Sequence, residues 1–378
     1  MTLIVGFTVG TQPVLLGDLL ISGPEPKHDS LNLPTIGESQ KVFPVGSGFM
    51  ITGITQKVNV LSENLMIAWA GRRYIAKSIL TELNALIRRE PLTIESLKEY
   101  FEDFERSENR RQVHFVGAFV ENANVHSFSI GGEVVSDPAW RDLRLAGTGT
   151  EDVKTFLKNV QPLKLITTGS PDPPLQAVAR SLTLTAHLLQ LELQNQSTLL
   201  QFYGAGYEIA SLVAGRFAKI ADVTYLLWEA DATGKALQLG QPYYIVKNSY
   251  RNRVLAIRSS RLTDKTRDGM PLFDESTHLV EPAFRAISEE DVVTFRSKPP
   301  DMNSRFLVNL FLIRYRDGST EWMNRIDYRV TPNTHVVFVE RTDGIGVAIE
   351  RRFVESILAE LQSRISVRQH REGNERTI

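Results

Sequence analysis

The residue with the clearest potential for covalent chemistry is Thr2, which directly follows Met1. A small second residue generally permits removal of the initiator methionine, and removal would leave Thr2 with a free α-amine. Such a threonine carries its own nucleophile in Oγ and its own base in the amine, whose ordinary pKa is roughly 7.7 to 8.0. Many proteins begin with Met-Thr, however, so this feature alone favours an ordinary first-strand threonine.

Two charged residues have spacings that could bring them beside Thr2. Asp18 follows sixteen residues later, at the end of a second apolar segment, and a hairpin would return it to the start of the first. Lys57 precedes Gly71 by fourteen residues, and a hydrophobic segment ending in Ala70-Gly71 lies between them. Taken singly, Asp18 is typical of a strand-end turn residue and Lys57 of a surface lysine.

Taken together, these blocks resemble the β subunits of the proteasome and their bacterial two-component relative, which are N-terminal-nucleophile hydrolases. The shared pattern is Thr-x(15)-Asp, then Lys-Val, then a hydrophobic strand that ends in Ala-Gly before a helix. The segment 145–149, Leu-Ala-Gly-Thr-Gly, resembles the family's Gly-Ser-Gly loop, and 203–206, Tyr-Gly-Ala-Gly, resembles its Ser-Gly-Gly strand start. The resemblance covers about Thr2 to Ala214.

The resemblance implies a role for each matching residue. Thr2 would be the nucleophile and, through its amine, the base. Lys57 would be a cation near Thr2 Oγ that lowers its pKa or relays its proton, and Asp18 would keep Lys57 charged and oriented. The backbone N–H of Gly71 would form the oxyanion hole, and Thr148 would hydrogen-bond the N-terminal amine.

The sequence departs from the family pattern in three respects. Gln201 stands where the family has an Asp, and Gly204 where it has the Ser of Ser-Gly-Gly. Because those family residues help to orient the amine, the changes weaken the expected catalysis. The segment between Asp18 and Lys57 is longer than usual. Lys41, which also precedes a Val-Phe pair, is an alternative lysine, although only Lys57 has the right spacing to the Ala-Gly segment.

The elements that must position these residues come in blocks of strands and blocks of helices. Apolar patterns predict strands at 3–9, 14–16, 42–54 (as a hairpin), 58–60, 65–69, 113–120, 125–130 and 143–145, with strands resuming at Leu199 and Tyr207. Helical spacing covers 75–87, a segment capped by Thr93, 150–158 and 175–194. A long loop is expected at 22–38.

This block order predicts an α+β fold, because parallel βαβ winding would need strands and helices to alternate. The resemblance implies a four-layer αββα sandwich in which two packed antiparallel sheets are flanked by helix pairs. A C-terminal β-rich α+β extension would follow. The expected domains are a proteasome-like hydrolase domain at 2–215, a β-rich domain of unrecognised role at 221–366, and a disordered charged tail at 367–378.

Within the C-terminal region, strands are predicted at 223–228, 243–247, 254–257, 306–315 and 336–340. Hairpin turns are predicted at Arg316–Ser319 and at Asp343-Gly344. Polar loops are expected at 264–274 and 297–303, and a closing helix at 353–365.

The composition excludes several classes of function. The 378 residues include 43 basic and 44 acidic ones, so no basic excess favours nucleic acid or an anionic membrane. There is no cysteine, which excludes disulfides, cysteine zinc sites and cysteine nucleophiles. The seven histidines lack metal-binding spacing, so neither a metal nor another cofactor is expected. No apolar run reaches the roughly 18 to 20 residues that span a bilayer, which predicts a cytoplasmic protein.

The expected function is a threonine-type peptidase that cleaves peptides or unfolded proteins through an acyl-enzyme on Thr2. The family analogy adds a homo-oligomeric ring and a possible ATPase unfoldase partner. Two alternatives remain open: a catalytically inactive scaffold or binding subunit, and a small-molecule amide hydrolase. The positions Leu20, Ser22 and Met66–Trp69 predict a hydrophobic substrate residue before the scissile bond.

Overall fold

A computed structural model of the protein describes residues 2–24, 31–43, 46, 48–159, 173–234, 236–267, 270–297, 302, 304–328, 335–341 and 344–375. The chain divides into two compact units. The first comprises Met1–Ala221, Asn248–Arg258 and Thr277–Pro300, and the second comprises Asp222–Lys247, Ser259–Ser276 and Asp301–Ile378. The first unit therefore includes two segments that lie beyond the boundary expected at 215–221.

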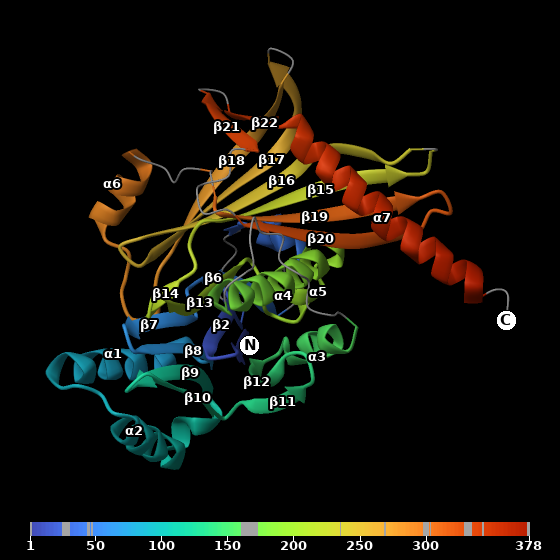
Figure 1. The fold of residues 1–378 in the computed structure, drawn as a ribbon. Coiled ribbons are helices and arrows are strands. Elements are labelled where there is room, and N and C mark those ends of the chain that lie inside the picture. Colours follow the sequence, from blue (N-terminus) through green and yellow to red (C-terminus); the bar gives the residue numbers. More distant parts are fainter. Residues whose placement is uncertain are drawn as a thin grey trace. The chain divides into compact units, whose positions relative to one another are not determined.

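A six-stranded antiparallel sheet carries the N-terminus of the first unit (Figure 1). Its order is β11-β12-β1-β2-β13-β14. The strands are β1 (Leu3–Val9), β2 (Gln12–Asp18), β11 (Glu133–Asp137), β12 (Arg141–Gly147), β13 (Tyr207–Val213) and β14 (Arg216–Lys219). Strand β1 is paired on both edges, by β2 and β12, and its first residues are fully buried because the second sheet and α4 pack against it.

A second, four-stranded antiparallel sheet has the order β10-β9-β8-β7. Its strands are β7 (Val58–Ser62), β8 (Leu65–Gly71), β9 (Val113–Glu121) and β10 (Asn124–Ile130). The two sheets share one apolar cluster, in which Ile4 and Leu15 of the first sheet meet Val58, Met66 and Val116 of the second.

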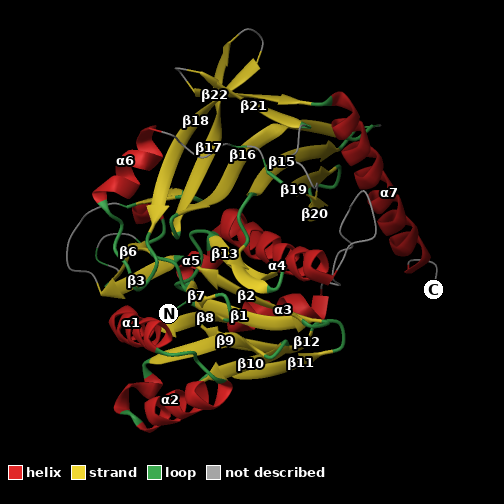
Figure 2. Cartoon of the chain, turned by 60° about the vertical axis from the view of Figure 1, so that its left-hand side comes forward, coloured by secondary structure: helices red, strands yellow, loops and turns green. Residues whose placement is uncertain are grey.

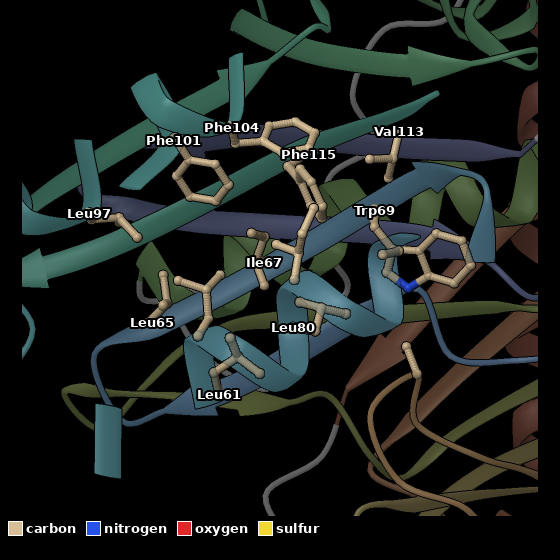
Figure 3. Packing of buried hydrophobic residues seen from close by; sticks show 14 of the residues in the cluster. Leu61, Leu65, Ile67, Trp69, Leu80, Leu97, Phe101, Phe104, Val113 and Phe115 are labelled. Atoms are coloured by element: carbon tan, nitrogen blue, oxygen red, sulfur yellow. The ribbon is translucent and has the colours of Figure 1, made fainter. Parts of the chain in front are cut away.

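Two helices, α1 (Arg73–Arg89) and α2 (Ile94–Arg106), follow β8 and pack on the second sheet. Leu80 of α1 and Phe101 of α2 join Ile67, Trp69 and Phe115 of the strands in one buried cluster (Figure 3). Helix α2 begins as predicted, because Thr93 forms a capping box with Ser96.

Three further helices contact or follow the first sheet. They are α3 (Thr150–Asn159), α4 (Pro173–Asn195) and α5 (Ser197–Leu200). Helix α4 packs on β1, β2 and β13 (Figure 2), and α3 packs on β12. The strand expected at Leu199 is wrong, since this residue lies in α5 and its side chain is buried.

The hairpin expected within 42–54 is also wrong. The residues of β6 (Phe49–Ile54) pair with β3 (Leu20–Pro24), and η1 (Ser39–Lys41) precedes them. Residue 47 of the expected turn, and residues 44 and 45 before it, lie outside the described residues. The long loop expected at 22–38 contains a short hairpin of β4 (Asn32–Leu33) and β5 (Gly37–Glu38).

The second unit is built on an eight-stranded sheet with the order β20-β19-β15-β16-β17-β18-β22-β21. Its strands are β15 (Val223–Ala232), β16 (Gln238–Arg251), β17 (Val254–Arg267), β18 (Met270–Val280), β19 (Phe306–Tyr315), β20 (Thr320–Tyr328), β21 (Val336–Arg341) and β22 (Gly344–Ile349). Parts of β16, β17 and β18 belong to the first unit, as does α6 (Glu289–Ser297). The polar loop expected at 264–274 is largely strand, in β17 and β18.

One long helix, α7 (Arg351–Glu375), covers the second unit's sheet (Figure 1). Phe353, Ile357, Leu361 and Ile365 recur every four residues and enter the sheet's core. The helix continues to Glu375, into the segment expected to be a disordered tail from 367, and residues 376–378 lie outside the described part. Of the predicted turns, Arg316–Ser319 joins β19 to β20, whereas Asp343 lies outside the described residues.

No helix in the described part of the chain has both the length and the apolar character needed to cross a membrane.

The aromatic contacts of α2 should be essential to the first unit. Phe101 is 3% exposed and its ring lies 5.7 Å from that of Phe115 and 5.5 Å from that of Phe128. We expect Phe101→Ala to lower the free energy of unfolding by about 3 to 5 kcal/mol, measured by chemical denaturation. The control Val134→Ala, at a side chain 55% exposed, should change it by less than about 0.5 kcal/mol. Equal effects would contradict this view of the core.

Candidate active site

The β1–β2 hairpin brings Thr2 and Asp18 together. Its antiparallel register pairs Ile4 with Gly17, which places the last residue of β2 beside the residue that precedes β1. Thr2 Oγ1 donates a hydrogen bond to Asp18 Oδ1, and both residues are fully buried. The predicted proximity of these two side chains is thus present in the structure.

Lys57, which immediately precedes β7, completes a buried polar cluster with them. Its Nζ donates to Asp18 Oδ1 at 2.6 Å and to the carbonyl oxygen of Leu20 at 2.6 Å, and its side chain is 0% exposed. Burial lowers the pKa of Lys57 below its ordinary value, while the Asp18 carboxylate opposes this shift. Lys57 is therefore a buried amine whose charged form is disfavoured by burial and favoured by one carboxylate.

Backbone amides satisfy the rest of the Asp18 carboxylate. Leu3 N donates to Oδ1 at 2.8 Å, and the amides of Leu20 and Gly204 each donate to Oδ2 at 3.0 Å. Gly204 has a φ of +123°, a conformation that side chains rarely permit. Gly204 therefore contributes only a backbone donor to the Asp18 carboxylate.

The loop after β12 lies against the carbonyl group of Thr2. Thr148 Oγ1 donates to Gln201 O at 2.6 Å and to Thr2 O at 3.4 Å. A Cβ on Gly147 would lie 1.9 Å from Thr2 O, so only glycine fits there. The contact of Thr148 is thus with the carbonyl oxygen, and its expected hydrogen bond to the freed amine stays a prediction.

Gly71 ends β8 with a φ of +113°, and a Cβ there would lie 2.3 Å from Gln112 O. The residue lines an open cavity of about 830 Å³. No hydrogen bond joins Gly71 to Thr2 among the described residues, so its oxyanion role stays a prediction. The alternative Lys41 ends η1, and its side chain lies outside the described part of the structure.

Most of the apolar side chains expected to contact the substrate are buried in the protein core. Leu20 and the four residues Met66–Trp69 are fully buried, and none of them lines the cavity beside Gly71. Ser22 does line it. The structure therefore gives no support to a hydrophobic pocket made from these side chains.

A buried glutamate that the sequence analysis did not identify fixes the backbone at Lys57. Glu208 of β13 accepts from the amides of Lys57 and Val58 at 2.5 and 2.6 Å, and Lys219 Nζ donates to its other oxygen. In the sequence, the feature that could have revealed Glu208 is a single acidic residue within the otherwise apolar strand segment 207–210.

A second unpredicted acid, Glu192 of α4, lies behind Gly204. It accepts from Ala205 N at 3.1 and 3.2 Å, and from the hydroxyls of Thr35 and Thr198. Burial raises the pKa of Glu192 to about 7. Adjacent amides at 204 and 205 thus bind Asp18 and Glu192 respectively. In the sequence, the feature that could have revealed Glu192 is a single acidic residue within the leucine-rich helix segment 188–193.

The cluster offers a hydroxyl, a carboxylate and an amine in hydrogen-bonded contact away from bulk water. A carboxylate of this kind orients the hydroxyl, and the Lys57 cation beside it favours the charged form of that carboxylate. No group of three or more His, Asp or Glu side chains within the described residues could hold a metal ion.

No protein-family model and no curated protein matches the chain.

The raised pKa of Glu192 predicts a defined pH dependence of stability. The pKa of Glu192 is about 7 in the folded protein and about 4.5 in the unfolded chain. Its contribution to the stability of the folded state is therefore fully present below pH 4.5 and is lost as the pH rises through 7. Glu192→Gln removes this loss. The difference in the free energy of unfolding, Glu192→Gln minus the unsubstituted protein, should therefore increase by about 3 kcal/mol between pH 4.5 and pH 8.

The measurement is denaturant unfolding across this pH range, with the exposed Glu99→Gln as the matched control. A flat difference between Glu192→Gln and the unsubstituted protein would show that Glu192 does not titrate in this way.

Proposed function

We propose that the protein is a threonine-type N-terminal-nucleophile hydrolase whose nucleophile is Thr2. The observation that carries the proposal is that one fully buried carboxylate, Asp18, contacts both Thr2 Oγ1 and Lys57 Nζ. A buried ion pair is not required to hold an ordinary strand-end threonine, and apolar residues would do so at lower cost. A hydroxyl, carboxylate and amine in contact are, in contrast, suited to nucleophilic chemistry.

In this mechanism, removal of Met1 frees the Thr2 amine. Thr2 Oγ attacks the substrate carbonyl carbon while its proton passes to the amine. The tetrahedral intermediate collapses as the C–N bond breaks, and the leaving amine takes that proton. Water then attacks the carbonyl carbon of the resulting ester, the bond between that carbon and Thr2 Oγ breaks, and the acyl group leaves as a carboxylic acid while Thr2 regains its hydroxyl. A backbone donor at Gly71 would stabilise the oxyanion by roughly 2.7 to 4 kcal/mol.

The finer architecture belongs to the same proposal. Two sheets that share an apolar cluster, with α1 and α2 on one and α3 and α4 on the other, support a four-layer αββα sandwich. Peptides or unfolded proteins are the proposed substrates. A homo-oligomeric ring, an ATPase unfoldase partner and a cytoplasmic location are carried only by analogy with the family.

A specific observation favours a second candidate, a non-catalytic binding subunit. Thr2 is 0% exposed in the full chain, so its hydroxyl has no access to solvent before processing. The positions of the family's amine-orienting Asp and Ser are Gln201 and Gly204, whose contributions here are a backbone carbonyl and a backbone amide. The state of the N-terminus decides between the two functions.

Intact mass spectrometry before and after exposure to a threonine-directed β-lactone or peptide epoxyketone tests the nucleophile. We expect loss of Met1 and one adduct that maps to Thr2. The variants Thr2→Ala and Thr2→Ser should respectively abolish and retain the β-lactone adduct. A protein that keeps Met1, or one that loses it and stays unreactive, would favour the binding subunit.

Lys57 can be tested separately from the stability of the fold. Lys57→Met should slow adduct formation by a factor of roughly 10² to 10⁴ if the Lys57 side chain takes part in proton transfer from Thr2 Oγ. It should also lower the free energy of unfolding by about 3 to 5 kcal/mol, because Asp18 stays buried without its cation. The double variant Asp18→Asn/Lys57→Met removes both charges.

We expect the double variant to regain most of the lost stability and none of the reactivity, as measured by denaturation and by labelling rate. Lys98→Met, at an exposed lysine of α2, is the matched control. Labelling that returns together with stability would assign Lys57 a purely structural role.

A further inference from the structure

The cavity beside Gly71, termed here the basic cleft, begins one residue from the Asp18 cluster. Leu20, the first residue of β3, contributes its amide to Asp18 and its carbonyl to Lys57. Ile21 and Ser22, the next two residues, line the cleft together with the end of β8 and the start of α1. The cleft is therefore joined to the Asp18 cluster through the backbone of β3, although Thr2 itself is not among its lining residues.

Four cationic side chains line the basic cleft: Arg72, Arg73, Lys77 and Arg111. All four are exposed, and no Asp or Glu is among the lining residues of the described chain. Arg73 is paired with Glu281. The other three make no ion pair within the described part of the chain, so their charges are available to an anion.

The start of α1 adds to this positive potential. The N-cap residue, Arg72, makes no capping hydrogen bond with its side chain, and no acidic residue occupies the first turn. A helix N-terminus without such partners favours an anion, both through its dipole and through its unpaired N–H groups. Helix α1 has seventeen residues, so the peptide dipoles of several turns add at its N-terminus.

Two buried polar atoms of the cleft have no partner in the described structure. They are Ser22 Oγ and Gln112 Oε1, and each belongs to a residue that lines the cleft. Unsatisfied buried polar atoms are uncommon, because each costs about 1 to 3 kcal/mol. A hydroxyl can donate to an anion, so of these two atoms only Ser22 Oγ could gain a partner from an anionic ligand, whereas Gln112 Oε1 is an acceptor.

From these features we infer that the basic cleft binds a carboxylate of the substrate. The preferred substrates then carry a glutamate or aspartate side chain next to the scissile carbonyl, rather than the hydrophobic residue expected from the sequence. This inference about substrate class rests on the proposed hydrolase function, whereas binding of the acidic group by the cleft can be measured without hydrolysis.

The binding test uses the Thr2→Ala protein, which cannot form the adduct, and two N-acetyl tetrapeptide amides that differ only in a C-terminal Glu or Gln. Isothermal titration should give a dissociation constant about ten- to hundredfold lower for the Glu peptide, as expected for a hydrogen-bonded charge. The preference should weaken as salt is raised.

A kinetic test uses the unsubstituted protein and two peptide epoxyketones that differ only in Glu or Gln next to the reactive group. The adduct on Thr2 should form about tenfold or more faster with the Glu reagent. Lys77→Glu should remove or reverse both preferences. Arg88→Glu makes the same kind of charge change on the same helix, about 16 Å farther along it, and should leave them unchanged.

The two hypotheses fail in distinguishable ways. Equal labelling by the Glu and Gln reagents would retain the hydrolase and overturn the acidic preference. Tighter binding of the Glu peptide without any labelling would retain the anion site and count against the hydrolase. Equal binding of both peptides, or binding of neither, would overturn the inference.

Discussion

The structure of the first unit depends on one buried charge, the carboxylate of Asp18. Removing such a group from water costs several kcal/mol unless donors surround it. The donors here are the Lys57 ammonium, the Thr2 hydroxyl and the amides of Leu3, Leu20 and Gly204. They come from separate parts of the sequence, so the carboxylate can be satisfied only when β1, β3, the start of β7 and the segment before β13 are all in place.

The groups around this centre limit its freedom further. Glu208 holds the backbone of Lys57, and Glu192 holds the amide next to the one that Gly204 gives to Asp18. Each of these acids is itself fully or almost fully buried. Three carboxylates at the ends of strands and helices therefore fix the position of one lysine and one turn, which is the kind of rigid support that a reactive group requires.

The parts of this arrangement that are local in sequence could be predicted, and those that are non-local could not. The β1–β2 hairpin follows from two apolar runs and a turn, so the approach of Asp18 to Thr2 was predictable, as was the Thr93 cap of α2. The pairing of β6 with β3 and the burial of Glu192 and Glu208 depend on distant segments. The cluster of charges around Gly71 could not be predicted either, because Arg111 joins Arg72 and Lys77 only in the folded chain.

The first unit is not continuous in sequence, and this affects the order in which it can be completed during synthesis. Gln56 Nε2 donates to the carbonyls of Arg253 and Val280, each at 2.8 Å, and Tyr250 Oη donates to Glu208 at 3.2 Å. A nascent chain that has emerged only to residue 221 therefore lacks partners for buried groups next to Lys57. Although N-terminal domains generally fold first on the ribosome, Gln56, next to Lys57, gains these two partners only from residues 197 and 224 positions downstream.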